Sequence, residues 1–191
     1  MVVPLILVAL IIIVIIIILG AVHYIQYKKY TPYYEIEQQE LDNIDGPTMH
    51  RNANPLVISF IEPISLKANV EKYHIYSMLT LFKQTKKVIL GDNYYTSAAE
   101  LLLIRVDTTT NITLINPKYK KYLKYNTPTS DFKEYILPEE TSANVSTIDI
   151  TMREYNILYI PRFWFFNVQT HDEINMYSAD SLFSSIFRLW N

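Results

Sequence analysis

The chain contains no cysteine and only three glycines among its 191 residues. Without cysteine it has no disulfide, no thiolate nucleophile and no cysteine-based zinc site, which suits a reducing compartment. The glycines, at positions 20, 46 and 91, are too few and too far apart to form a glycine-rich phosphate loop. A formal net charge of −2 gives no general attraction to nucleic acid, so we expect no nucleic-acid partner.

Charge is also absent from residues 1–22, which consist almost entirely of Ile, Val, Leu and Ala. A helix of this length reaches about 33 Å, enough to cross a hydrocarbon core of about 30 Å. A secretory signal peptide is the rival interpretation, but no Lys or Arg precedes the run, and the run is too long for such a peptide. The sequence therefore predicts an uncleaved, single-pass transmembrane anchor over residues 1–22, with a lipid bilayer as its partner.

The residues that follow the apolar run predict the orientation and a spacer. Lys28 and Lys29 lie just beyond the run, so the positive-inside rule places the C-terminal domain in the cytosol. Residues 23–53 are expected to form a juxtamembrane tether, with one short candidate helix over residues 35–41. The remaining residues, 54–191, have the size of a single domain with a real core.

Beyond Pro55 the sequence consists of short β-branched or aromatic runs separated by polar or proline-containing breaks, a pattern typical of strands. The expected strands lie at residues 56–61, 88–90, 101–106, 112–115, 146–150, 156–160 and 163–168. One helix is predicted over residues 70–83 from the i, i+3, i+7 spacing of Val70, Tyr73, Ser77, Thr80 and Leu81. Many short strands with one or two helices predict a mainly β sandwich or barrel.

The stretch from Ser146 to Val168, STIDITMREYNILYIPRFWFFNV, resembles the second conserved block of cupin-like proteins of the JmjC class. In that family a strand leads into a Gly-Asp turn, a Leu-Tyr-Ile-Pro strand and a Trp-Trp-His segment whose histidine binds iron. The strands at 101–106 and 112–117 are similar to an upstream strand pair of the family, and residues 184–190 resemble its closing strand. The resemblance implies a cupin-like double-stranded β-helix of the jellyroll type.

The chain departs from this family at the metal site. Phe166 stands where the family has its last iron-binding histidine, and Tyr155 and Asn156 stand where it has the Gly-Asp turn. No histidine between residues 91 and 100 supplies the family's His-x-Asp or His-x-Glu pair. Iron in such enzymes needs two imidazoles and one carboxylate. The resemblance therefore implies a degenerate site at these three residues, with Phe166 filling the space of a ligand and with no metal, cofactor or catalytic residue.

One histidine does lie beside carboxylates, in the run His171-Asp172-Glu173. In isolation these residue types suit a weak metal site or an acid–base pair. Consecutive residues of a loop point their side chains in different directions, so we expect an ordinary polar loop here.

Lysine and tyrosine are interleaved over residues 118–125. The lysines at 118, 120, 121 and 124 form a candidate binding patch, because lysine beside tyrosine suits anionic lipid or single-stranded nucleic acid. The alternation is also typical of a half-exposed edge strand that lysine protects from aggregation.

Three functions remain open from the sequence. The abundance of Ile, Tyr, Asn and Lys, residues with A/T-rich codons, suggests a large DNA virus as the source. The anchor and the lost ligands predict a non-enzymatic structural or protein-interaction component that links a virion membrane to its capsid through other membrane or capsid proteins. The alternatives are an iron- and 2-oxoglutarate-dependent oxygenase with an unusual site, and a glycan- or lipid-binding module that uses the aromatic residues.

Overall fold

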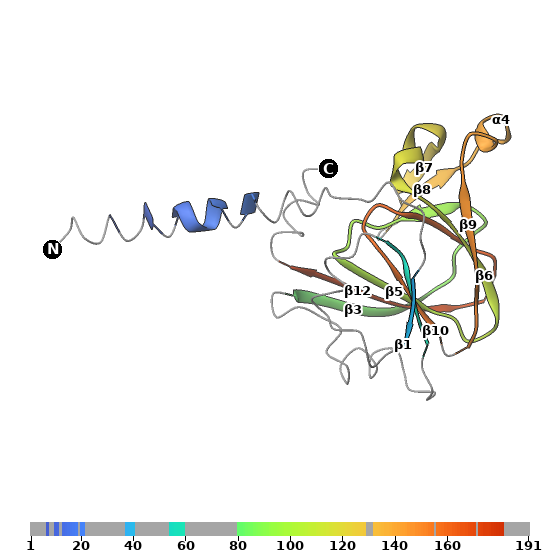
Figure 1. Ribbon diagram of the computed structural model, residues 1–191, viewed down its shortest axis with the longest axis horizontal. Helices are drawn as coiled ribbons and strands as arrows, with labels where there is room; N and C mark the ends of the chain where they lie inside the picture. Colours follow the sequence, from blue (N-terminus) through green and yellow to red (C-terminus); the bar gives the residue numbers. More distant parts are fainter. Residues whose placement is uncertain are drawn as a thin grey trace.

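The computed structural model describes residues 54–59, 80–128, 132–154, 156–170 and 172–181, together with the strand Glu37–Glu40 and parts of residues 7–21. In this part of the chain two six-stranded sheets make up most of the structure (Figure 1). Sheet A contains, in spatial order, β1 (Glu37–Glu40), β2 (Leu56–Ser59), β10 (Asn156–Ile160), β5 (Leu101–Arg105), β12 (Ile174–Ser181) and β3 (Thr80–Val88). Sheet B contains β7 (Lys124–Pro128), β8 (Lys133–Ile136), β4 (Tyr94–Thr96), β11 (Phe165–Val168), β6 (Thr110–Ile115) and β9 (Thr147–Met152). The predicted mainly β fold is confirmed.

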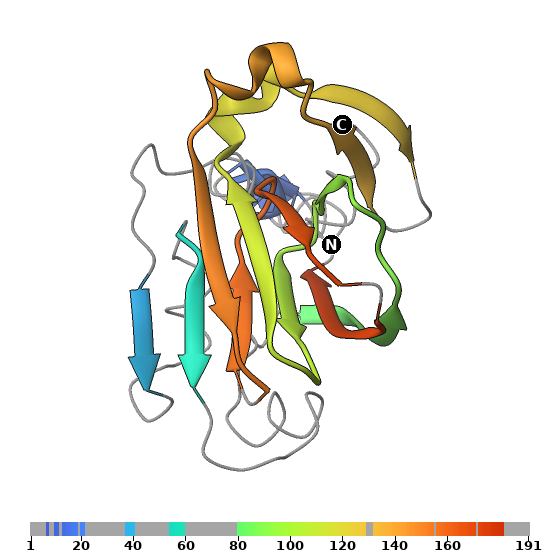
Figure 2. The ribbon, with the colours of Figure 1, turned by 90° about the vertical axis from the view of Figure 1, so that its right-hand side faces the viewer.

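Eight of these strands pair in a nested order. Strand β3 pairs with β12, β4 with β11, β5 with β10 and β6 with β9, and every pair is antiparallel. The nested pairs amount to one long hairpin, which is rolled up so that β12 also lies beside β5, and β11 beside β6 (Figure 2). This is the strand order of a jelly roll. The jellyroll-type double-stranded β-helix implied by the resemblance is therefore confirmed by the topology.

An insertion separates β6 from β9 and projects from one end of the jelly roll (Figures 1 and 2). We call residues 116–146 the insertion; it contains the 3-10 helix η2 (Pro117–Tyr122), strands β7 and β8, and the short helix α4 (Glu139–Ser142). Helix η2 begins where it does because the Asn116 side chain accepts a hydrogen bond from the Lys118 amide at 3.0 Å, and Pro117 occupies the first helical position.

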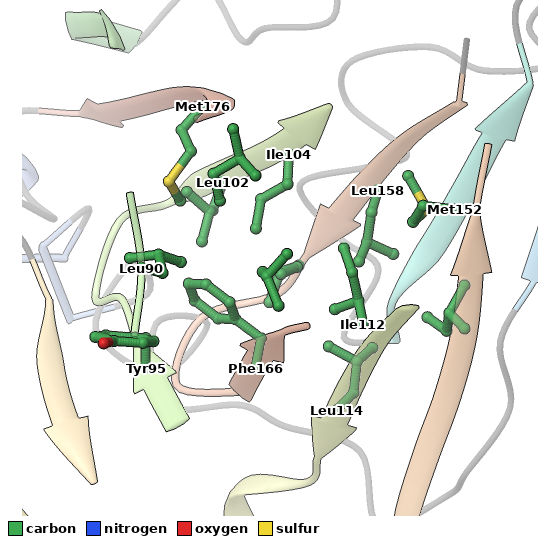
Figure 3. Packing of buried hydrophobic residues seen from close by; sticks show 14 of the residues in the cluster. Leu90, Tyr95, Leu102, Ile104, Ile112, Leu114, Met152, Leu158, Phe166 and Met176 are labelled. Atoms are coloured by element: carbon green, nitrogen blue, oxygen red, sulfur yellow. The ribbon is translucent and has the colours of Figure 1, made fainter. Parts of the chain in front are cut away.

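The main core lies between the two sheets, because alternate residues of each strand point inward. Figure 3 shows part of this cluster, in which Phe166 lies close to the side chains of neighbouring strands. Sheet A contributes Val57, Leu102, Ile104, Leu158, Ile160, Ile174 and Met176, and sheet B contributes Tyr95, Ile112, Leu114, Ile150, Met152, Phe166 and Val168. The interior of the jelly roll is thus a continuous apolar core.

The central strands β5 and β10 of sheet A are buried on both faces. Leu101, Leu103, Ile157 and Tyr159 alternate with the inward residues, and each of them is also buried. A strand buried on both faces reads as a continuous apolar run, which explains the unbroken Leu101-Leu102-Leu103-Ile104 sequence. By contrast, β9 alternates, and its Thr147, Asp149 and Thr151 are exposed.

The two helices predicted beyond residue 22 are wrong wherever the structure describes their residues. Residues 80–83 of the predicted helix over 70–83 belong to β3, whose long ladder with β12 outweighs a weak helical spacing; residues 70–79 lie outside the described residues. Within the predicted helix over 35–41, Glu37–Glu40 is an edge strand that pairs in parallel with β2. The predicted strand over 88–90 is reduced to Val88, the last residue of β3.

The predicted closing strand over residues 184–190 lies outside the described part of the chain, and β12 is the last strand of the roll there. Among the residues that are described, none belongs to a helix both long and apolar enough to cross a membrane. The anchor, the tether and the domain boundaries stay predictions.

Candidate functional site

Phe166 lies in the interior of the jelly roll, with no exposed surface. Strand β11 holds it between Tyr95 of β4 and Leu114 of β6 (Figure 3). Its ring centroid is 6.2 Å from that of Tyr95 and 5.9 Å from that of Phe132, which meets it edge-on at 87°. Trp164 is equally buried in the same cluster. The degenerate-site hypothesis requires this inward position, although the replacement of a metal ligand by Phe166 stays a prediction.

The residues around Phe166 do not fit an iron ion. The cluster consists of aliphatic side chains, aromatic rings and the thioethers of Met152 and Met176, whereas iron in the resembled family needs imidazole and carboxylate donors. The Tyr95 hydroxyl, a polar atom of this cluster, accepts a hydrogen bond from the Gly91 amide at 2.9 Å. Within the described ranges, no three His, Cys, Asp or Glu residues are grouped to hold a metal ion. We therefore derive no chemistry through a metal in this interior.

Of the other two degenerate-site residues, the structure describes only Asn156, and it lies away from Phe166. Asn156 is the first residue of β10 in sheet A, where it pairs with Ser59 and is half-buried. Its amide donates to the Arg153 carbonyl at 3.0 Å, which closes the turn between β9 and β10. Asn156 is thus in the opposite sheet from Phe166, and Tyr155 lies outside the described residues.

The structure describes two of the three residues of the run His171-Asp172-Glu173, which follows β11. His171 lies outside the described residues, whereas Asp172 and Glu173 are exposed. The Glu173 carboxylate lies 3.3 Å from the Lys87 ammonium on β3. In the described part, Glu173 therefore takes part in a surface ion pair between a loop and a strand.

The lysine-rich segment is a 3-10 helix, so the alternative of a half-exposed edge strand is wrong for residues 118–122. A 3-10 helix has three residues per turn, which places positions i and i+3 on one edge. Tyr119 and Tyr122 therefore share one edge of the helix, and their ring centroids are 6.2 Å apart. Lys118 and Lys121 share the neighbouring edge. A three-residue period thus places the two tyrosines on a different edge of the helix from Lys118 and Lys121.

A second, smaller core supports this helix on the outer face of sheet B. Ile115, Leu123, Tyr135 and Phe165 are buried together, with Tyr119 packed against them. The rings of Tyr135 and Phe165 meet edge-on at 4.9 Å. On β11, therefore, Phe165 anchors the insertion while its neighbour Phe166 fills the interior.

Polar side chains line the rest of the outer face of sheet B. The Thr113 hydroxyl donates to Asp149 at 2.6 Å, and the Thr151 hydroxyl donates to Asn111 at 2.9 Å. Burial, and to a lesser extent the Asp149 charge, raises the pKa of Tyr94 at the border of this surface. The alternation in Thr-Ile-Asp-Ile-Thr was the sequence signal for this row, because it marks a strand with one polar face.

Charged groups gather where β5 begins and β12 ends, a site that the sequence did not indicate. The Glu100 amide donates to the carboxylate of Asp180 at 3.0 Å, and Asp180 is buried at 6 % exposure. Burial raises the pKa of the nearby Tyr159; the Arg162 charge lowers it and the Glu100 charge raises it, and burial dominates. Glu100 and Asp180 are far apart in the sequence, so only the fold brings them together.

The buried Tyr159 predicts the response to alkali. Its pKa is higher in the folded chain than the usual value of 10, so its stabilising contribution is complete below pH 10 and falls as the pH rises beyond it. One such group costs about 1.4 kcal/mol per pH unit in that window. In urea unfolding between pH 9 and about pH 11, Tyr159→Phe should therefore lose less stability with pH than the wild type does.

Thr151→Ala is the control, because that side chain is exposed and does not titrate. It should lose stability with pH as steeply as the wild type. If Tyr159→Phe also followed the wild-type slope, the proposed effect of Tyr159 burial would be wrong.

Comparison with known proteins identifies no family. No family model matches the chain, and no curated protein matches it. Among solved structures, dTDP-4-dehydrorhamnose 3,5-epimerase from Bacillus anthracis, with TDP and PPi bound, is 13 % identical, at a TM-score of 0.30 over 64 % of this chain and 63 % of that one. The same enzyme from Elizabethkingia anophelis is 12 % identical, at 0.29 over 64 % and 62 %. The chain thus spans less than two thirds of the length of these proteins, and a likeness this distant carries no functional argument.

Proposed function

We propose that the chain is a non-enzymatic jelly-roll module, carried on a single-pass membrane anchor, that serves as a structural or protein-interaction component. The observation that supports this most is the filled interior, in which Phe166 and Trp164 have no exposed surface. Small-molecule sites are concave, with a few polar groups converging on the ligand. Hydrocarbon packing at that place leaves the outer surfaces of the domain for binding.

The scaffold, on this proposal, is a degenerate relative of the cupin-like JmjC class. The Leu-Tyr-Ile-Pro segment ends β10 and is followed by the aromatic strand β11, the order that the resemblance implies. Tyr155, Asn156 and Phe166 replace the family's turn and iron ligand in that stretch. If the domain was selected for stable packing and no longer for catalysis, the iron-binding histidine could be replaced by a phenylalanine such as Phe166.

The setting of the module comes from the sequence. The uncharged run over residues 1–22 suits a bilayer, and Lys28 and Lys29 favour a cytosolic domain. An A/T-rich codon bias suits a large DNA virus, in which such a protein would link the virion membrane to the capsid. Other membrane or capsid proteins are the partners that this role requires.

Both alternatives need an interior different from the described one. An oxygenase needs an iron site, and the side chains around Phe166 offer no donor set for it. A glycan- or lipid-binding pocket needs accessible aromatic faces, whereas Trp164, Phe165 and Phe166 are each at most 1 % exposed. A ligand could reach these rings only by opening the core.

The experiment is an oxygenase assay on the full-length chain, purified in non-ionic detergent with Fe(II) and 2-oxoglutarate. We expect neither stoichiometric iron nor 2-oxoglutarate consumption above the protein-free reaction. Phe166→His should behave in the same way, because one imidazole does not restore a site that needs three ligands. Chelator-sensitive consumption by the wild-type chain would overturn the non-enzymatic assignment.

The membrane and partner claims are tested separately in native membranes. Extraction at alkaline pH should leave the chain in the pellet, and cross-linking there should join it to a defined protein neighbour. Release into the supernatant would contradict the anchor, and a chain without any cross-linked neighbour would contradict the interaction role.

A further inference from the structure

The lysine edge of the insertion, formed by Lys118, Lys120, Lys121 and Lys124, is exposed at every position. Lys118 and Lys121 share one edge of η2 because a 3-10 helix repeats every three residues. Lys120 lies on another edge of the same helix, and Lys124 follows the extended residue Leu123 where β7 begins. Within the described residues, no carboxylate lies within ion-pair distance of Lys120, Lys121 or Lys124. These cations are therefore presented to solvent together.

The backbone beneath these lysines is held in place by three sets of contacts. Asn116 caps the start of η2, and Leu123 and Tyr119 join the second core. At the other end the Thr141 hydroxyl donates to the Tyr122 carbonyl at 2.9 Å. A surface of fixed charges binds more tightly than one that must be ordered first.

The tyrosine rings of the segment contact other groups of the protein, including that of Tyr125, which is 52 % exposed and meets the Tyr135 ring edge-on at 5.4 Å. Tyr119 and Tyr122 are half-buried, and the ammonium groups of Lys118 and Lys121 lie 5.0 Å and 4.8 Å from their ring centroids. Binding of single-stranded nucleic acid depends on aromatic rings that are free to stack on bases. The geometry thus favours an anionic surface that is recognised by charge alone.

We propose that the lysine edge binds the anionic, phosphate-bearing headgroups of the bilayer in which the chain is anchored. This inference rests on the proposed membrane anchor, which would hold the insertion at a high effective concentration beside the headgroups. Each lysine near an anionic surface strengthens binding about fivefold at physiological salt. The effect is screened by added salt, since the Debye length falls from about 8 Å to about 3 Å at 1 M.

Two carboxylates of the insertion act against this binding. Glu139 and Glu140 begin α4 and are exposed, on the helix whose Thr141 contacts η2. They lower the positive potential of the same end of the molecule. Removing these two negative charges should therefore strengthen headgroup binding, so the proposal also predicts a variant that binds more tightly than the wild type.

The experiment compares the full-length chain in vesicles of phosphatidylcholine with the chain in vesicles of equal parts phosphatidylcholine and phosphatidylserine. Lysines are acetylated by a water-soluble reagent and their rates are read by mass spectrometry. Lys118, Lys120, Lys121 and Lys124 should react at least about fivefold more slowly on the anionic vesicles, and 1 M salt should remove the difference. Lys87, on strand β3 of sheet A, is the control and should react equally on both.

Glu139→Gln combined with Glu140→Gln should increase the protection, whereas equal acetylation rates on the two vesicles would overturn the proposal. Protection by an oligonucleotide but not by phosphatidylserine would also overturn it, in favour of nucleic acid. Flotation with phosphatidylcholine vesicles reports on the anchor alone. If the anchor were wrong but the lysine edge bound headgroups, the chain would float only with vesicles that contain phosphatidylserine. Failure of the anchor and failure of headgroup binding therefore give different results.

Discussion

Replacement of Phe166 by alanine should lower the free energy of unfolding of the domain by about 3–5 kcal/mol. The ring is fully buried, and the rings of Tyr95 and Phe132 lie about it at 6.2 Å and 5.9 Å. Its removal forfeits the transfer free energy of the side chain and leaves a cavity between two sheets that cannot close freely. Urea unfolding followed by tryptophan fluorescence measures the loss, because Trp164 belongs to the same cluster.

Ile89→Ala is the matched control, since that apolar side chain is 65 % exposed just after β3. Its cost should stay within about 0.5 kcal/mol. A Phe166→Ala chain as stable as the wild type would show that the ring does not fill the interior, and the proposed function would lose its main support.

Replacement of Leu103 by aspartate should prevent folding altogether. Leu103 is central in β5, between Tyr159 of β10 and Tyr177 of β12, and has no exposed surface. A carboxylate there must be buried without a partner or protonated, at a cost above about 4 kcal/mol, a large share of the 5–15 kcal/mol that stabilises a domain of this size. Circular dichroism and proteolysis should report an unfolded or aggregated chain.

Thr151→Asp is the control for this experiment. Thr151 is exposed on the polar face of β9, where an additional carboxylate stays in water. That variant should fold, with a change in stability of about 0.5 kcal/mol or less. A soluble, folded Leu103→Asp chain would contradict the burial of β5 on both faces.

The strands that could be predicted from the sequence are those that lie deepest in the fold. The strands at 101–106 and 156–160 were marked by unbroken apolar runs, and both are central in sheet A with two buried faces. The strand over 146–150 was predicted as a short β-branched run, and as β9 its residues alternate and give it one polar face. Where burial determines the residue type, the pattern can be read from a single sequence.

The strands that could not be predicted depend on partners far along the chain. Strand β3 contains Lys83, Lys86 and Lys87, and neither its composition nor its spacing distinguishes it from a helix or a loop. It is a strand because it pairs along the whole of β12. Strand β4 is only three residues long, and β8 alternates too weakly to stand out. Tertiary pairing decided these elements.

The candidate site, like the strands, could be predicted from the sequence only in part. The resemblance predicted an inward position for Phe166, which is where the residue lies, whereas Asn156 at the start of β10 is in the opposite sheet. For the lysine segment the sequence left an alternating edge strand open, although Asn116-Pro117 is a helix-start signal and Lys118 and Lys121 are three residues apart. The contact between Glu100 and Asp180 had no sequence signal, because it depends on the register of β5 and β12.

The most direct test of the filled interior is an electron-density map of crystals grown with Mn(II), as a substitute for Fe(II), and 2-oxoglutarate. We predict continuous density for the Phe166 ring between Tyr95 and Phe132, with neither metal nor ligand among these side chains. A coordinated ion, or a solvent-filled chamber with Phe166 turned away from the core, would contradict the account.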